Sequence, residues 1–196
     1  MTITRRSTLA DVAVIVAANL RSAGFTAVLT GGACATIYSD GAYQSYDLDF
    51  IIRAGGNRRD LDQAMAGIGF VRDGDRYHHR ATAFFVEFPR GPLAIGDDVD
   101  IRPVELKIGR GRTLALSPTD ACRDRLAAFY HWSDRQSLHS AVAIARRHRV
   151  NLAAIRRWSD REGAADRFAE FLAALRDRPA RATPARAHAA NRAGPR

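Results

Sequence analysis

Apolar residues first recur at helical spacing along this chain and then at alternate positions. Over residues 9–20 they keep a three-and-four spacing, which predicts a helix that Gly24 closes. Alternation over 27–30 and 46–53 predicts two strands, with a short helix at 33–38 between them. The chain therefore opens as a helix followed by mixed strand and helix.

A further helix, capped by Asn57, precedes three more segments with the pattern of strands. These lie at about residues 70–72, 77–88 and 104–116, and a glycine-rich turn at 109–111 divides the last of them. Strands interrupted by helices in this way predict a mixed sheet with helices packed on it.

From Ser117 the pattern becomes helical. Ser117 is followed by proline at the first helical position and by an acid at the third, and Ser133 with Gln136 predicts a second capping box. We therefore expect an α+β fold with a C-terminal helical segment. The predicted divisions are an α/β core over 1–116, a helical segment packed on it over 117–176, and a disordered tail rich in arginine, alanine and proline over 177–196.

Composition narrows the class of protein. The 196 residues are 46% hydrophobic and 26% charged, as in globular proteins, and no apolar run approaches the roughly 20 residues of a membrane span. The two cysteines form no CxxC pair, so neither a disulfide framework nor a zinc site is indicated. We expect a cytoplasmic protein without a membrane partner. The net charge of +9 also permits RNA binding through the arginine-rich tail.

The strand at 46–53 carries two aspartates on one face. Asp47 and Asp49 are two positions apart and point together, whereas Leu48 and Phe50 point into the core. Two such carboxylates repel each other unless they share a cation, and Mg²⁺ prefers one or two carboxylates together with substrate phosphates. The pair predicts a metal site.

Two glycines lie where the preceding strand meets its helix. Because Gly31 and Gly32 lack Cβ atoms, their backbone N–H groups can approach a phosphate at the helix N-terminus. An anion site and a cation site would then share one cleft.

These two segments resemble the polymerase-beta-like nucleotidyltransferase superfamily. The likeness covers residues 28–87 well and the helices over 117–147 more loosely, and it is carried by Leu-Thr-Gly-Gly-Ala and Ser-x-Asp-Leu-Asp-Phe. It is strongest to the small bacterial branch of minimal nucleotidyltransferases and toxin–antitoxin components. The resemblance implies a nucleotidyltransferase-type sheet on which Asp47, Asp49 and a third carboxylate bind two Mg²⁺ (or Mn²⁺) ions. It also implies that Gly31, Gly32 and Ser45 contact the nucleotide.

The third carboxylate has three candidates. Glu87 belongs to an alternating strand that ends at Pro89, and it is our first choice. Asp98 and Asp100 also alternate, but the glycine- and proline-rich segment before them favours a loop. A glutamate here, and glycine rather than serine at position 32, depart from the common family pattern.

Arginine must supply the cation for a triphosphate, because Lys107 is the only lysine. Arg53 follows the paired aspartates, and the resemblance places a basic residue near the nucleotide on the helix that carries Arg125. Tyr43 and Trp132 are candidates for stacking on a base, although a core position is the alternative for the tryptophan.

The expected activity is transfer of a nucleoside monophosphate from an NTP, with ATP as our choice, to a hydroxyl acceptor with release of pyrophosphate. The acceptor could be a protein, a tRNA or a small molecule. The alternatives are a catalytically silent module that binds a partner protein in a toxin–antitoxin pair, and an RNA-binding protein.

Overall fold

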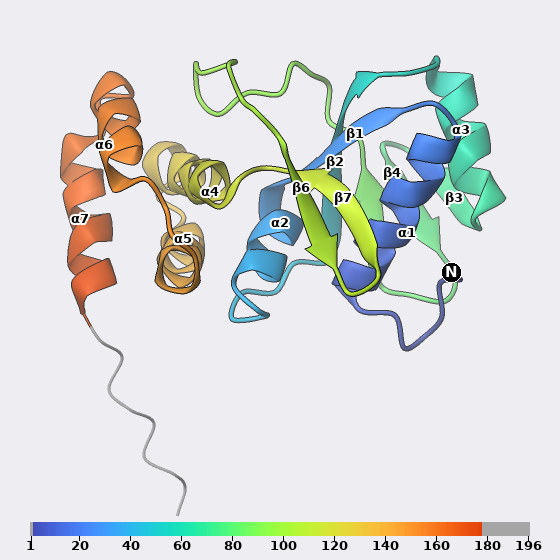
Figure 1. Cartoon of the computed structure of the whole chain (residues 1–196), viewed down its shortest axis with the longest axis horizontal. Helices are drawn as coiled ribbons and strands as arrows, with labels where there is room; N and C mark the ends of the chain where they lie inside the picture. The colour runs from blue at the N-terminus through green and yellow to red at the C-terminus, as the bar shows by residue number, and fades with distance from the viewer. Residues whose placement is uncertain (1, 178–196) are drawn as a thin grey trace, which may run out of the picture.

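The computed structural model describes residues 2–177, which form seven strands and seven helices. The strands make one mixed sheet in the order β3-β4-β5-β2-β1-β7-β6 (Figure 1). The neighbours β2 and β5 are parallel, as are β1 and β7, and the other pairs are antiparallel. The predicted mixed sheet flanked by helices is confirmed.

Helices and strands alternate from α1 to α3, five strands follow up to residue 115, and the chain is helical after it. The strands are β1 (Thr26–Thr30), β2 (Asp47–Ala54), β3 (Phe70–Asp73), β4 (Arg76–His79), β5 (Phe85–Glu87), β6 (Val104–Ile108) and β7 (Gly111–Ala115). The helices are α1 (Leu9–Ser22), α2 (Gly31–Tyr38), α3 (Arg58–Gly67), α4 (Pro118–Trp132), α5 (Arg135–Arg147), α6 (Leu152–Arg161) and α7 (Ala165–Arg176).

The helices α1 and α3 pack against each other on the sheet, α1 against β1 and β7 and α3 against β3 (Figure 1). Both helices begin with a capping box, made by Thr8 in α1 and Asn57 in α3. Leu48, Phe50 and Val86 point to one face of the sheet and are fully buried. Burial of these side chains fixes the register of β2 and β5, because a slip by one residue would turn the apolar set to the opposite face.

The helices α4–α7 gather beside the sheet, on the side of α2 (Figure 1). Both α4 and α5 pack against α2. The Tyr38 hydroxyl at the end of α2 donates a 2.8 Å hydrogen bond to the carbonyl of Leu116, just before α4. The helical half is thereby held against the element that starts at the two glycines.

Two predicted elements differ in the structure. Residues 77–88 form two antiparallel strands, β4 and β5, in which Tyr77 pairs with Val86. The turn between them includes a 3.1 Å hydrogen bond from the Thr82 amide to the His79 carbonyl. Residues 80–84 contain no glycine, proline, asparagine or aspartate, so the sequence carries no turn signal at this place.

The second difference is the cap of α5. Ser133 ends α4 in a left-handed conformation with φ of 56°, and Asp134 is the N-cap that accepts from the Gln136 amide at 2.9 Å. The carboxylate of Asp134 therefore replaces the predicted serine as the capping group.

The predicted boundary at 116/117 falls between β7 and α4. The predicted tail, apart from Asp177, lies outside the described residues. No helix within 2–177 has the length and apolar character needed to span a membrane.

Candidate active site

Three carboxylates lie together on the open face of the sheet. Asp47 and Asp49 are on β2, and Asp49 is directly paired with Glu87 on the parallel neighbour β5. Paired positions of neighbouring strands point to the same face, so all three side chains project to the side opposite Leu48 and Phe50. The structure thus places the first-choice third carboxylate beside the aspartate pair.

This crowding changes the ionisation of Asp49. Burial, followed by the charges of Asp47, Glu87 and Asp124, raises the pKa of Asp49 to about 7. A carboxylate in low-dielectric surroundings with like charges nearby holds a proton more tightly, and a bound cation would reverse the effect. The site is therefore suited to positive charge.

Gly31 brings the start of α2 against this carboxylate. Its φ is 63°, in the left-handed region that favours glycine, and a Cβ atom there would collide with Oδ2 of Asp49. Thr30, the residue before it, pairs with Asp49 across β1 and β2. The first turn of α2 contains no acidic residue, and no side chain caps its backbone N–H groups, which are therefore available to an anion.

Gly32 leaves room for a side chain from another segment. A Cβ atom at this position would lie 2.5 Å from the Ser45 hydroxyl and 3.4 Å from the Tyr43 hydroxyl. The Ser45 hydroxyl in turn donates a hydrogen bond to Asp47. The hydroxyl that the resemblance places after the first glycine is therefore absent at position 32, and that of Ser45 lies next to its place.

Glu87 is engaged by an arginine that the sequence did not indicate. Nε of Arg76 on β4 donates to Oε1 of Glu87 at 2.7 Å, and the guanidinium lies 4.7 Å from the centroid of the Phe85 ring. Arg76 pairs with Glu87 across the β4–β5 hairpin, which was itself missed as a hairpin. No pattern along the chain signals this contact.

Helix α4 contributes an ion pair to the edge of the site. Arg125 donates to Oδ2 of Asp124 through Nε at 3.0 Å and Nη2 at 2.7 Å, and only 15% of its side chain is exposed. Burial acts to lower the pKa of Arg125, but the charges of Asp124, Tyr43 and Asp49 outweigh it and raise the pKa. Hydrogen bonds from Ser137 and Gln136, with the charge of Arg125, lower the pKa of Asp134.

The charge of Arg125 therefore acts on Asp49 on one side and on Asp134 on the other. Asp124 is a site residue that sequence reasoning missed. Its adjacency to Arg125 was the available signal, but charged residues on helices are mostly solvated.

The other candidates are not brought to the carboxylates. Arg53 is exposed near the far end of β2, and at about 3.3 Å per residue it lies about 13 Å along the strand from Asp49. Asp98 forms ion pairs with Arg123 at 2.5 Å and Arg161 at 3.6 Å. Asp100 is in a loop, and 82% of its side chain is exposed.

The donor set suits a hard divalent cation in part. All three acids offer oxygen ligands, and Mg²⁺ needs only one or two carboxylates when substrate phosphates complete its shell. Within residues 2–177, however, no three His, Cys, Asp or Glu side chains are arranged to bind one ion as they stand. The third carboxylate, that of Glu87, is in an ion pair with Arg76. Asp47 and Asp49 thus fit Mg²⁺ or Mn²⁺ as a pair.

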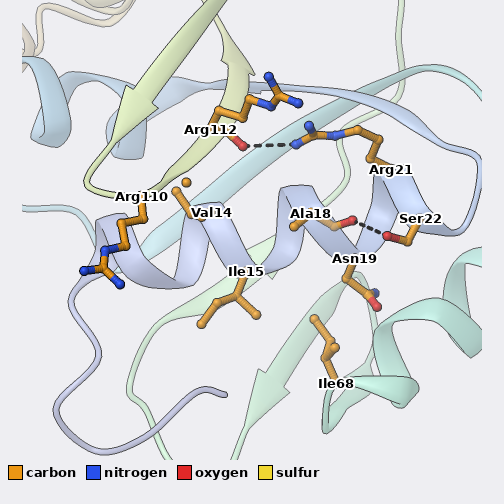
Figure 2. A pocket seen from close by; sticks show the side chains of 10 residues that line it. Val14, Ile15, Ala18, Asn19, Arg21, Ser22, Ile68, Arg110 and Arg112 are labelled. Carbon is orange, nitrogen blue, oxygen red and sulfur yellow. Dashed lines mark hydrogen bonds between the residues drawn. The ribbon is translucent and has the colours of Figure 1, made fainter. Parts of the chain in front are cut away.

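A separate hollow of about 510 Å³ lies along α1, away from these residues (Figure 2). Val14, Ile15 and Ile68 form its apolar part. Arg110 and Arg112 line it from the β6–β7 turn, and the Arg21 guanidinium donates to the Arg112 carbonyl at 3.1 Å. None of the predicted site residues lines it.

Comparison with known proteins supports the fold. No protein-family model matches the chain, and no curated protein matches it. Among solved structures, the chain is similar to an antigenic nucleotidyltransferase-like protein from Paracoccidioides brasiliensis, with a TM-score of 0.51 and 16% identity. The match covers 86% of this chain and 95% of the other. The chain therefore has a nucleotidyltransferase-like fold.

Proposed function

We propose that this protein is a metal-dependent nucleotidyltransferase, which transfers a nucleoside monophosphate from an NTP, with ATP as the first choice, to a hydroxyl acceptor and releases pyrophosphate. The observation that carries the proposal is the placement of Asp47, Asp49 and Glu87 on one sheet face, against the glycine-led start of α2. Metal ligands and an anion site would then lie side by side.

Each residue has a role in this proposal. Asp47 and Asp49 hold the cation, and the backbone N–H groups at Gly31 and Gly32 position the phosphates. Arg125 offsets phosphate charge from α4, and the Ser45 hydroxyl orients Asp47. Glu87, once released from Arg76, completes the carboxylate set and accepts the proton of the acceptor hydroxyl. A bound Mg²⁺ or Mn²⁺ would neutralise phosphate charge and make that hydroxyl more acidic.

The test measures the binding of ATP to the full chain by calorimetry, in the presence and in the absence of Mg²⁺. Asp47→Asn and Asp49→Asn should abolish the Mg²⁺-dependent part of binding while circular dichroism stays unchanged. Asp100→Asn removes an exposed carboxylate outside the site and is the matched control. Equal binding by all three variants would refute the metal site.

One contact favours a second candidate, a catalytically silent module that binds a partner protein. The ion pair between Arg76 and Glu87 occupies the third carboxylate, as expected where the chemistry has been lost. Such a module should bind its partner equally well after Asp47→Asn, whereas the enzyme should lose nucleotide binding. A toxin–antitoxin partnership, a cytoplasmic location and a protein, tRNA or small-molecule acceptor belong to these proposals and rest on the sequence resemblance.

A further inference from the structure

Trp132, the last residue of α4, is largely exposed. Of its surface 76% is accessible, whereas Trp158 is 1% accessible in the core. An indole left in water forgoes the favourable burial that most aromatic side chains obtain. Its exposure excludes the core alternative considered from the sequence and calls for another use of the ring.

The position of Trp132 on α4 aligns it with the candidate site. It follows Arg125 by seven residues, which is close to two helical turns, so both lie on one stripe of the helix about 10 Å apart along its axis. Two residues lie between them on this stripe, the half-buried Ala128 and the buried Phe129. Helical side chains lean toward the N-terminus, so the indole leans back toward Arg125.

The turn that follows α4 leads directly into α5, which packs against α4. Asp134, two residues after Trp132, is the N-cap of α5. Its pKa is lowered by hydrogen bonds from Ser137 and Gln136 and by the charge of Arg125. Despite burial, the charge of Asp124, and to a smaller extent that of Asp49 on β2, raises the pKa of Arg125. Because α4 leaves the sheet directly after β7, Trp132 at its end lies farther from the sheet along this helix than Arg125 does.

The faces of the indole are available. Within residues 2–177, the aromatic ring in contact with Trp132 is that of His131, at 6.0 Å between centroids and with the planes at 68°. At 76% exposure the indole keeps most of its surface accessible to a planar group. Bases stack on exposed aromatic rings with little dependence on their identity.

We propose that Trp132 is the stacking platform for the base of the NTP whose phosphates lie between the start of α2 and Arg125. This inference rests on the proposed function and adds the contact that separates a nucleotide from a bare polyphosphate. The base would lie about two helical turns from the phosphates, against the end of α4.

The test compares Mg²⁺ complexes of the four NTPs with Mg²⁺ and inorganic triphosphate, which lacks a base, using the full chain. For the NTP that binds most tightly, Trp132→Ala should weaken binding about tenfold or more, while triphosphate binding stays within about twofold. Trp132→Phe keeps a ring and should retain most of the affinity. The NTP, but not triphosphate, should quench the fluorescence of wild type, and Trp132→Phe should remove the quenching while the signal of Trp158 reports an intact core.

The outcomes separate the two proposals. Unchanged NTP affinity in Trp132→Ala, with no quenching in wild type, overturns the stacking role and leaves the nucleotidyltransferase proposal standing. An equal loss of NTP and triphosphate binding also overturns it, because the residue would then act on the phosphate site. If wild type binds neither ligand, the proposed function fails and the stacking role fails with it.

Discussion

At the scale of single residues, Asp49 shows how its surroundings determine the chemistry of the candidate site. Its pKa of about 7 follows from burial, Asp47, Glu87 and Asp124. Near neutral pH the carboxylate is therefore partly protonated without a cation, and metal binding would release that proton. The same environment lowers the stability of the folded protein once the Asp49 carboxyl group ionises.

We predict that Asp49→Asn raises the stability of the metal-free protein at and above pH 7. The folded pKa lies above the ordinary value of 3.8, so the folded state binds more protons than the unfolded state between about pH 4 and 7. Wild-type stability should then fall as pH rises through this window, by at most about 4 kcal/mol at about 1.36 kcal/mol per pKa unit. Urea unfolding at pH 4.5, 6 and 8 measures this change in the free energy of unfolding.

The variant should lack most of this pH dependence, so its advantage over wild type grows from acid to neutral pH. Asp100→Asn, at an exposed carboxylate, is the control and should follow the wild-type profile. Parallel profiles for wild type and Asp49→Asn would show that the carboxylate is not destabilised by its neighbours.

A second residue-scale prediction concerns Gly32 and Ser45. Gly32→Ser places a Cβ atom 2.5 Å from the Ser45 hydroxyl and should cost about 1–3 kcal/mol of stability through overpacking. The double variant Gly32→Ser/Ser45→Gly should recover most of the loss, because it exchanges the positions of the hydroxyl and the free space. Thermal unfolding of the two variants measures these changes in stability.

Gly67→Ser is the matched control, because a Cβ atom at Gly67 would meet nothing within 4 Å. It should change stability by about 0.5 kcal/mol or less. If the double variant is no more stable than Gly32→Ser, the Ser45 side chain is not the obstacle.

At the scale of elements, the β4–β5 hairpin controls the third carboxylate. Parallel pairing of β2 and β5 brings Glu87 beside Asp49, while antiparallel pairing of β4 and β5 brings Arg76 onto Glu87. Strand β5 therefore places the Glu87 carboxylate at the site, and β4 places the Arg76 guanidinium that pairs with it. A divalent ion at the aspartates would compete with Arg76 for Glu87.

We predict that Arg76→Gln tightens Mn²⁺ binding in the absence of nucleotide several-fold. The change removes a positive charge and frees Glu87, whose pair with Arg76 is worth about 1 kcal/mol at this exposure. Titration followed by electron paramagnetic resonance of free Mn²⁺ measures the affinity. Glu87→Gln should instead weaken binding.

The control is Arg72→Gln on β3, which breaks an exposed ion pair with Asp62 and leaves Glu87 untouched. Mn²⁺ affinity should be the same in this variant as in wild type. Equal affinity in Arg76→Gln and wild type would mean that the ion pair does not restrain the site.

At the scale of the whole molecule, Arg123 joins the loop after β5 to the helical half. It lies on α4, is 9% exposed in its side chain, and pairs with Asp98 at 2.5 Å and Asp120 at 3.0 Å. Its guanidinium also lies 5.1 Å from the centroid of the Trp158 ring on α6. The sheet, its long loop and the helices are thereby held in one arrangement.

We predict that Arg123→Ala lowers the free energy of unfolding by about 3 kcal/mol. Breaking a buried ion pair leaves an unpaired charge, and the lower end of the usual range applies because Asp98 is 25% exposed. Arg102→Ala, which removes an 88% exposed partner of Asp100, should cost about 0.5 kcal/mol or less. Similar losses in the two variants would show that the network does not connect the halves.

The sequence by itself determined the features that local spacing controls. Alternation placed Asp47 and Asp49 on one face of a strand, and the capping residues located the starts of α1, α3 and α4. The glycine pair located the start of α2. These features depend on residues within about four positions of one another, so a single chain segment contains the information.

Only the tertiary structure decided which distant groups meet. Glu87 lies beside Asp49, Arg76 binds Glu87, and Arg125 reaches the site while Arg53 does not, because strand order and direction bring β5, β4 and α4 to one edge and carry the end of β2 away. The hairpin turn after His79 was hidden because residues 80–84 contain none of the glycine, proline, asparagine or aspartate that mark turns. Pairing between strands depends on burial summed over the whole sheet, and no local spacing along the chain reports that sum.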